Sequence, residues 1–370
     1  MKAKYFLLTV SLLLVGCQRS DPETARSIDS ASTSNETRPT ESQTRTSEAA
    51  VSVSTTPEIV AEELEIPWSI QSFADRFYLS ERGGTIVELQ GKSLNRQTVV
   101  LSAELANEAE AGLLGFVLAP DFATSQRAYA YYTYAESAAV INRVVSLELS
   151  GDTWRETDIL LDGIVSGAYH HGGRLAIGPD QRLYVTTGDG LYTADAQDRE
   201  SLRGKILRMN LDGSIPTDNP VADSYVYSFG HRNPQGLTWI DDQLYASEHG
   251  DQSNDEVNVI IAGNNYGWPI IQGSQTATAM EAPLVTSGPD TTWAPSGIAA
   301  HEGLLYVALL RGEGILVVNP QTQQITIRYQ SYGRIRDVMF VEDTIYFVTN
   351  NRDGRGSATL KDDYLYRVHP

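Results

Sequence analysis

A short phrase that recurs along the chain limits the fold more than any other feature of the sequence. The phrase is an apolar strand, a turn containing Asp or Gly, and a second apolar strand containing tyrosine; its clearest copy runs from Arg174 to Val185. Six copies carry tyrosines 40 to 61 residues apart, at Tyr78, Tyr129, Tyr184, Tyr245, Tyr306 and Tyr346. Each copy is a β-hairpin signal. Because an isolated hairpin is marginally stable, the copies must stack to bury their apolar faces.

The period of this repeat predicts the architecture. A β-helix has much shorter repeats, and a sandwich does not repeat at this period. No long apolar pattern of helical period is present. The sequence therefore predicts an all-β fold, a six-bladed β-propeller of four-stranded antiparallel blades, over residues 57–370. The strand-like segment at 364–368 is expected to complete a blade together with the N-terminal part of the propeller and so close the ring.

The charge balance excludes several classes of partner. The chain has 28 Lys+Arg against 47 Asp+Glu, a net charge of −19. A nucleic-acid-binding domain is normally basic, and so is a surface patch that binds anionic lipid. We therefore expect no nucleic-acid partner. The single cysteine, Cys17, excludes an intrachain disulfide.

The N-terminal residues are typical of an export signal. Lys2 and Lys4 precede a short apolar run, and residues 14–17, Leu-Val-Gly-Cys, resemble the bacterial lipobox. That resemblance implies a signal peptide over 1–17 and lipidation of Cys17; the alternative is an ordinary signal peptide with an incidental cysteine. Residues 18–56 hold 17 Ser+Thr in 39 positions and no aromatic residue, which predicts a disordered tether. We expect an exported protein that is attached to the bacterial cell envelope through lipid alone.

The unusual polar residues fall on the connections between hairpins, which gather at one face of a propeller. Four of the six histidines and four arginines lie there. The arginines are Arg232, Arg311, Arg334 and Arg336. Guanidinium groups suit carboxylates or phosphates, and no glycine-rich phosphate loop is present, so the pattern favours a carboxylate-bearing ligand. Any one arginine could instead form a surface or inter-blade salt bridge.

Five motifs, which occur in family order, resemble the soluble quinoprotein aldose sugar dehydrogenases of the glucose/sorbosone dehydrogenase family, from about Leu64 to Val368. They are Gly112-Leu-Leu-Gly115 with Pro120-Asp-Phe122, His170-x-Gly-Gly-Arg174, Leu202-Arg-Gly-Lys-Ile-Leu-Arg208, Gly230-His-Arg-Asn-Pro-Gln-Gly236 and Asn265-Tyr-Gly-Trp-Pro269. The family binds pyrroloquinoline quinone (PQQ), an ortho-quinone with three carboxylates, and Ca²⁺.

The resemblance implies roles for individual residues. His170 matches the general base that takes the proton of the sugar C1 hydroxyl while hydride leaves C1 for the quinone. Arg232 and Asn233 match the pair that contacts the cofactor, with Arg232 also catalytic beside the quinone oxygens. The alternative for His170 is a turn histidine bonded to backbone. Three further arginines match positions that hold the cofactor carboxylates: Arg311, Arg334 and Arg336.

Glu110 matches a family position, Gln or Glu, that touches the cofactor. A glutamate beside three carboxylates is unfavourable unless it is protonated or paired.

The resemblance also implies metal ligands. Gly250 and Asp251 match residues whose main-chain oxygens bind the Ca²⁺ beside the quinone, although glucose-oxidising members carry Pro where Asp251 stands. Glu256, by its carboxylate, and Tyr266, by its main chain, match another metal site, and an inter-blade hydrogen bond is the alternative for Glu256. Ca²⁺ prefers six to eight oxygen ligands, which such loops can offer.

Together these features predict an enzyme that oxidises the C1 hydroxyl of an aldose to a lactone with PQQ. A Ca²⁺-dependent propeller lactonase or esterase is the first alternative, but it does not account for four convergent arginines. A non-enzymatic surface propeller that binds glycans or a protein is the second, and it has no need of His170, Arg232 and Asn233 together. The sugar, the electron acceptor and the oligomeric state are left open by the sequence.

Overall fold

Each copy of the repeated phrase forms a β-hairpin in the computed structural model, which describes residues 56–106, 109–137 and 139–369. The hairpin prediction is confirmed at all six positions. The hairpins are β2 (Pro67–Phe73) with β3 (Arg76–Glu81), β6 (Leu113–Leu118) with β7 (Arg127–Glu136), β10 (Leu175–Ile177) with β11 (Leu183–Thr187), β14 (Pro234–Ile240) with β15 (Gln243–Glu248), β18 (Pro295–His301) with β19 (Leu304–Leu309), and β22 (Ile335–Val341) with β23 (Thr344–Thr349).

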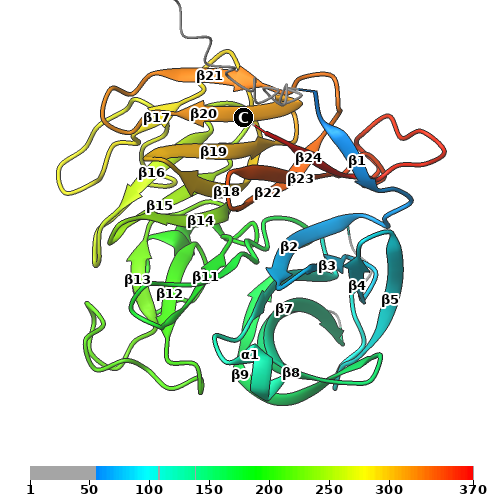
Figure 1. Cartoon of the computed structure of the whole chain (residues 1–370). Coiled ribbons are helices and arrows are strands. Elements are labelled where there is room, and N and C mark those ends of the chain that lie inside the picture. The colour runs from blue at the N-terminus through cyan, green and yellow to red at the C-terminus, as the bar shows by residue number, and fades with distance from the viewer. Residues whose placement is uncertain (1–55, 107–108, 138, 370) are drawn as a thin grey trace, which may run out of the picture. The chain divides into compact units, whose positions relative to one another are not determined.

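Four of these hairpins belong to sheets of four antiparallel strands (Figure 1). Three sheets follow chain order, and two more strands extend each hairpin. The added strands are β12 (Lys205–Met209) and β13 (Val226–Phe229), β16 (Glu256–Ile260) and β17 (Val285–Thr286), and β20 (Gly314–Val318) and β21 (Ile325–Arg328).

The fourth sheet joins the two ends of the folded chain. Its order is β1-β24-β23-β22, so that β1 (Glu58–Ala61) pairs with β24 (Leu365–Val368). The antiparallel register places Glu58 opposite Arg367. This confirms the expectation that the last strand completes a sheet with the N-terminal end of the folded part.

The remaining two hairpins share one eight-stranded sheet, and here the structure departs from the predicted four-stranded antiparallel blades. It adds β4 (Thr85–Gln90), β5 (Ser93–Val100), β8 (Ala139–Ser150) and β9 (Thr153–Ser166), in the order β2-β3-β4-β5-β9-β8-β7-β6. Strands β5 and β9 pair in parallel over three residue pairs. The indole N–H of buried Trp154, in β9, donates to Gln97, in β5, at 2.7 Å. This buried bond holds the two halves together.

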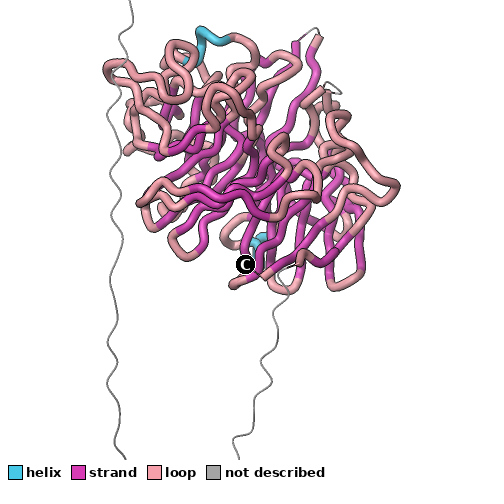
Figure 2. Tube along the Cα trace, turned by 90° about the horizontal axis from the view of Figure 1, so that it is seen from above, coloured by secondary structure: helices cyan, strands magenta, loops and turns pink. Residues whose placement is uncertain are grey.

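Helix is nearly absent from the described residues. Only α1 (Phe122–Ser125) and the 3-10 segment η1 (Thr193–Ala196) are helical. Neither approaches the length needed to cross a membrane. In Figure 2 the strands occupy the middle of the unit and the connections lie around them.

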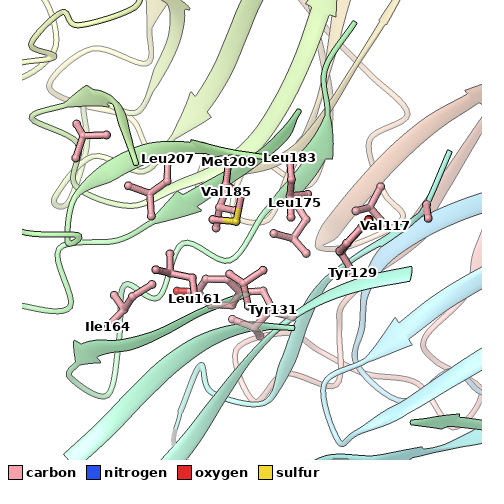
Figure 3. Packing of buried hydrophobic residues seen from close by; sticks show 14 of the residues in the cluster. Val117, Tyr129, Tyr131, Leu161, Ile164, Leu175, Leu183, Val185, Leu207 and Met209 are labelled. Carbon is pink, nitrogen blue, oxygen red and sulfur yellow. The ribbon is translucent and has the colours of Figure 1, made fainter. Parts of the chain in front are cut away.

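The core lies between neighbouring sheets, because alternate residues of each strand point to the same face. Figure 3 shows one such layer, in which side chains of β10–β12 face side chains of β6, β7 and β9. The labelled residues are Val117, Tyr129, Tyr131, Leu161, Ile164, Leu175, Leu183, Val185, Leu207 and Met209. Six of them, in β6, β7, β10 and β11, come from strands that the repeat predicts; Leu161 and Ile164 of β9 and Leu207 and Met209 of β12 do not. The layer packs two neighbouring sheets against each other.

A buried ion pair connects the first strands of four hairpins. Asp337, in β22, accepts a hydrogen bond from the Ile70 N–H of β2 at 2.9 Å and from Arg174 Nη1 at 3.0 Å. Arg174, directly before β10, also donates through Nε to the Gln235 carbonyl of β14 at 2.7 Å. Both charged side chains are at most 8% exposed. The last position of the His-x-Gly-Gly-Arg motif is therefore structural.

We expect Asp337→Asn to lower the free energy of unfolding by about 3–5 kcal/mol, because it leaves the buried Arg174 charge without its partner. Urea denaturation measures this as a lower midpoint at an unchanged slope. Glu58→Gln is the matched control. It breaks the exposed pair with Arg367 at 2.9 Å and should cost under about 1 kcal/mol. Equal losses in the two variants would contradict a role for the buried pair.

Candidate functional site

The connections at one end of the strands line an open cavity of about 280 Å³, which we call the main cavity because most of the predicted site residues line it. Eight connections contribute to it, from the segment before β6 to the loop between β23 and β24. Its lining residues are Glu110, Tyr169, His170, Arg232, Asn233, His249, Gly250, Asp251, Gln252, Asp255, Thr292, Ala294, Leu310, Arg311, Arg334 and Arg355. Most of the predicted site residues, far apart in sequence, thus meet at one place.

A smaller cavity of about 20 Å³, the adjoining cavity, shares four wall residues with the main cavity. The shared residues are Glu110, His249, Leu310 and Arg355. Arg82, Arg336 and His171 line only the adjoining cavity. Two linked spaces, both rich in arginine, therefore form one region.

His170 is held by a buried carboxylate that the sequence analysis did not single out. Its Nδ1 lies 2.7 Å from Asp189 Oδ1, and Asp189 is fully buried. Asp189 also accepts hydrogen bonds from the Leu191 N–H at 2.9 Å and the Trp268 indole N–H at 2.8 Å. Burial raises the pKa of Asp189, but the hydrogen bonds, led by that from His170, hold it below its ordinary value. A carboxylate only accepts, so Nδ1 carries the proton and Nε2 is free to take one.

The backbone near His170 leaves no room for a side chain at position 188. His170 has a left-handed φ of 63°. A Cβ added to Gly188 would lie 1.9 Å from the His170 carbonyl oxygen and 2.9 Å from Asn233 Oδ1. Gly188 therefore permits this close approach of two chain segments.

Arg232 and Asn233 stand together in the wall of the main cavity, and both are buried. Asn233 Oδ1 accepts the Gly172 N–H at 2.9 Å, which ties the β13–β14 connection to the histidine segment. The Arg232 guanidinium donates to the Asp251 carboxylate at 3.2 Å and lies 5.3 Å from the Trp268 ring.

The other predicted arginines divide between the two cavities. Arg311 lines the main cavity and is exposed, whereas Arg334 is buried and pairs with Asp353 at 2.8 Å. Arg336 lines the adjoining cavity, where it donates to Gln235 Oε1 at 2.8 Å. Burial lowers the pKa of Arg336 to about 9.

Glu110 is paired, as a glutamate at this position requires. Its Oε1 lies 2.7 Å from Arg355 Nη1, and its Oε2 accepts the His170 N–H at 3.1 Å. Burial raises the pKa of Glu110, but Arg355 and the His170 hydrogen bond lower it to about 2. Glu110 is therefore ionised at working pH.

Buried polar groups without a partner gather at these cavities. Ten buried side-chain atoms in the described part have no hydrogen-bond partner, and five belong to residues lining one cavity or both. They are the Nε atoms of Arg232, Arg334 and Arg336 and the Nε2 atoms of His171 and His249. Burial lowers the pKa of His171 and of His249 to about 4. Guanidinium N–H donors of this kind fit a carboxylate-bearing ligand.

The predicted metal ligands do not meet at one point. Gly250 and Asp251 line the main cavity, and the Asp251 carbonyl lies 3.5 Å from Arg232 Nη2. Glu256 and Tyr266 line neither cavity. Among the described residues no group of three or more His, Cys, Asp or Glu side chains is arranged to hold a metal ion.

The Glu256 carboxylate and the Tyr266 hydroxyl make hydrogen bonds within the protein. The Glu256 carboxylate accepts from the Gly273 N–H at 2.8 Å and from Asn258 Nδ2 at 3.2 Å. Burial, and then Glu248, raise the pKa of Glu256 to about 8. The Tyr266 hydroxyl donates to the Val259 carbonyl at 2.7 Å.

The sequence profile described as glucose/sorbosone dehydrogenase matches residues 64–366. The chain belongs to the glucose/sorbosone dehydrogenase family. Quinoprotein glucose dehydrogenase B of Acinetobacter calcoaceticus is 37% identical over 233 residues, which are 54% of this chain and 49% of that relative. The match thus spans about half of the relative's length.

Two aldose sugar dehydrogenases match over most of their length. Aldose sugar dehydrogenase YliI of Escherichia coli is 28% identical, and the match covers 80% of this chain and 90% of that protein. The PQQ-bound form of aldose sugar dehydrogenase from Streptomyces coelicolor is 36% identical in structure-based comparison. Its TM-score is 0.79, with coverage of 86% of this chain and 99% of that chain.

Two site residues of this chain, Asp189 and Arg355, were not predicted from the sequence. Asp189 lies in Gly188-Asp-Gly190 directly after β11, and a carboxylate between two glycines at a strand end could have indicated a site. Arg355 lies in the glycine-containing loop before β24. Cys17, the predicted signal peptide and the predicted tether up to residue 55 lie outside the described residues.

We expect Gly188→Ala to lower sugar-dependent dye reduction by about 10²-fold, because the added methyl group must displace His170 or Asn233 from the cavity wall. The measurement is kcat of sugar-dependent dye reduction, with circular dichroism as the check on folding. Gly83→Ala is the control, since nothing lies within 4 Å of a Cβ there. Full activity of Gly188→Ala would show that this close approach is dispensable.

Proposed function

We propose that this chain is a quinoprotein aldose sugar dehydrogenase that oxidises the C1 hydroxyl of an aldose to a lactone, with PQQ as its cofactor. One observation carries the proposal: His170, which Asp189 holds through Nδ1, lines the same 280 Å³ cavity as four arginines. A hydrolase needs no such set of cations, and a binding module needs no oriented histidine. The PQQ-bound relative from Streptomyces coelicolor supports the choice of cofactor.

The fold in this proposal is a six-bladed propeller. Six hairpins, each with two outer strands, account for the four-stranded sheets and for the two halves of the eight-stranded sheet. The first and last strands close the ring.

His170 is the proposed general base. Its Nε2 takes the proton of the C1 hydroxyl, while Asp189 holds Nδ1–H and stabilises the imidazolium that results. PQQ, when bound, supplies the quinone that accepts the hydride released from C1. Loss of one proton and one hydride converts the aldose into its lactone. A base that is already oriented beside the reacting carbon lowers the entropic cost of bringing the two groups together.

The arginines bind the cofactor in this proposal. Arg334, Arg336 and Arg311 hold its carboxylates, and Arg232 with Asn233 orients it. The unpartnered Nε groups of Arg232, Arg334 and Arg336 are donors suited to carboxylate oxygens. Arg232 would also stabilise the negative charge on the quinone oxygens of a bound cofactor that accepts hydride.

The proposed enzyme also binds Ca²⁺. Its candidate ligands are Gly250, Asp251, Glu256 and Tyr266. Main-chain and carboxylate oxygens are the donors that Ca²⁺ prefers. Ca²⁺ takes part in no proton or hydride step of this proposal. Because Glu256 and Tyr266 lie apart from the main cavity, the two pairs form two sites in this proposal.

We also propose that the catalytic domain, residues 57–370, is carried at the bacterial cell envelope. Residues 1–17 form a signal peptide that ends at lipidated Cys17, and residues 18–56 form the tether. The electron acceptor is then a molecule reachable from the envelope. Labelling with radioactive palmitate, lost in Cys17→Ser, tests this part of the proposal.

The function is tested by dye reduction with aldoses, using the purified domain with and without PQQ and Ca²⁺. The proposal expects reduction that requires PQQ and a lactone product identified by mass spectrometry. Sugar-lactone or ester hydrolysis that ignores PQQ would favour the lactonase, and sugar binding without either activity would favour the binding module.

A further inference from the structure

Arg355 is a cavity residue whose role neither the motifs nor the proposed mechanism assigns. It lies on the connection between β23 and β24 and lines both cavities. Its guanidinium pairs with Glu110, which is 245 residues away in sequence, at 2.7 Å. The side chain is 43% exposed, so this is the solvent-facing end of the pair.

The loop has another arginine that serves as an internal comparison. Arg352 donates through its guanidinium to the carbonyls of Asp362 and Leu360, and it lines neither cavity. Arg352 therefore ties the loop to itself, whereas Arg355 reaches across to a different segment. The loop thus presents Arg355 to the site.

Glu110 creates an electrostatic difficulty that Arg355 can remove. The carboxylate stands in the wall of the cavity where arginines are proposed to hold a polycarboxylate, and its low pKa keeps it charged. Like charges in a partly buried site repel strongly, because the low dielectric screens them poorly. Glu110 cannot simply turn away, since its other oxygen holds the His170 N–H at 3.1 Å.

We propose that Arg355 is a positioning residue that neutralises Glu110, so that the cavity accepts a cofactor with several carboxylates while Glu110 keeps its bond to His170. The inference rests on the proposed function. Glu110 and Arg355 act as one neutral unit, equivalent in charge to a neutral amide at position 110. A chain with glutamate at position 110 then needs a cation at position 355, and a chain with glutamine does not.

A double-mutant cycle tests this inference through PQQ binding, measured by quenching of tryptophan fluorescence at equilibrium. Arg355→Gln should raise the Kd for PQQ by about 10-fold or more, because it leaves an unpaired carboxylate beside the ligand. Glu110→Gln alone should not raise the Kd. The double variant should return to within about 3-fold of the unmodified chain. Arg127→Gln, an exposed arginine at the start of β7, controls for net charge and should leave the Kd unchanged.

The possible failures are distinguishable. A double variant as weak as Arg355→Gln, or a normal Kd in Arg355→Gln, would overturn the neutralising role while leaving the proposed function intact. Absence of PQQ binding to the unmodified chain would overturn both. Thermal unfolding of each variant identifies any loss that reflects misfolding, and Arg355→Lys, which keeps the charge, should then preserve most of the affinity.

Discussion

Replacement of His170 by alanine should lower kcat by about 10²-fold or more while PQQ affinity stays largely unchanged. The imidazole is the group proposed to take the C1 hydroxyl proton, and its removal leaves water as the base. The His170 side chain bonds to Asp189 and not to an arginine, so the proposed cofactor-binding cations keep their positions. Stopped-flow dye reduction gives kcat, and fluorescence titration with PQQ gives the affinity.

The matched variant for His170 is Asp189→Asn. An amide at position 189 keeps the size of the side chain but no longer compensates the imidazolium, so kcat should fall with little change in PQQ affinity. His301 lies at the end of β18 and lines neither cavity, so His301→Ala should keep full activity. Unchanged turnover in His170→Ala would remove this residue from the mechanism.

Much of the fold could be predicted because the hairpin signal is local. Alternating apolar residues on both sides of an Asp/Gly turn fix a strand pair without reference to the rest of the chain. The parallel pairing of β5 with β9 could not be predicted in this way. It depends on how Gln97 and Trp154, 57 residues apart, meet in the folded unit. Nothing in either local sequence specifies that meeting.

The candidate site also contains residues that local motifs predict and contacts that they do not. Residues in motifs at strand ends, such as His170 and Arg232, could be placed together because connections gather at one end of a stack of hairpins. The partners of these residues could not, because the Asp189 and Arg355 contacts join separate segments. Arg336 lies two residues from Arg334 yet lines a different cavity, which side-chain packing determines.

The second large effect is expected for the arginines that are proposed to hold the cofactor carboxylates. Arg334→Ala combined with Arg336→Ala should raise the Kd for PQQ by about 10²-fold or more, since a hydrogen bond to a charged group contributes about 1.5–3 kcal/mol. Saturating PQQ should then restore a large part of kcat, because these side chains bind the cofactor and do not move the proton. The Kd is measured by fluorescence titration, and kcat by dye reduction.

The control for this pair of variants must separate binding from folding. Arg334 pairs with buried Asp353 and Arg336 donates to Gln235, so their removal also costs stability. Arg311 makes none of the ion pairs found in the described part of the chain and is exposed. Arg311→Ala should therefore weaken PQQ binding with no change in the urea midpoint, and Arg334→Lys should lose less affinity than Arg334→Ala because it keeps the charge. Normal PQQ affinity in all of these variants would mean that the arginines hold the fold together and not the cofactor.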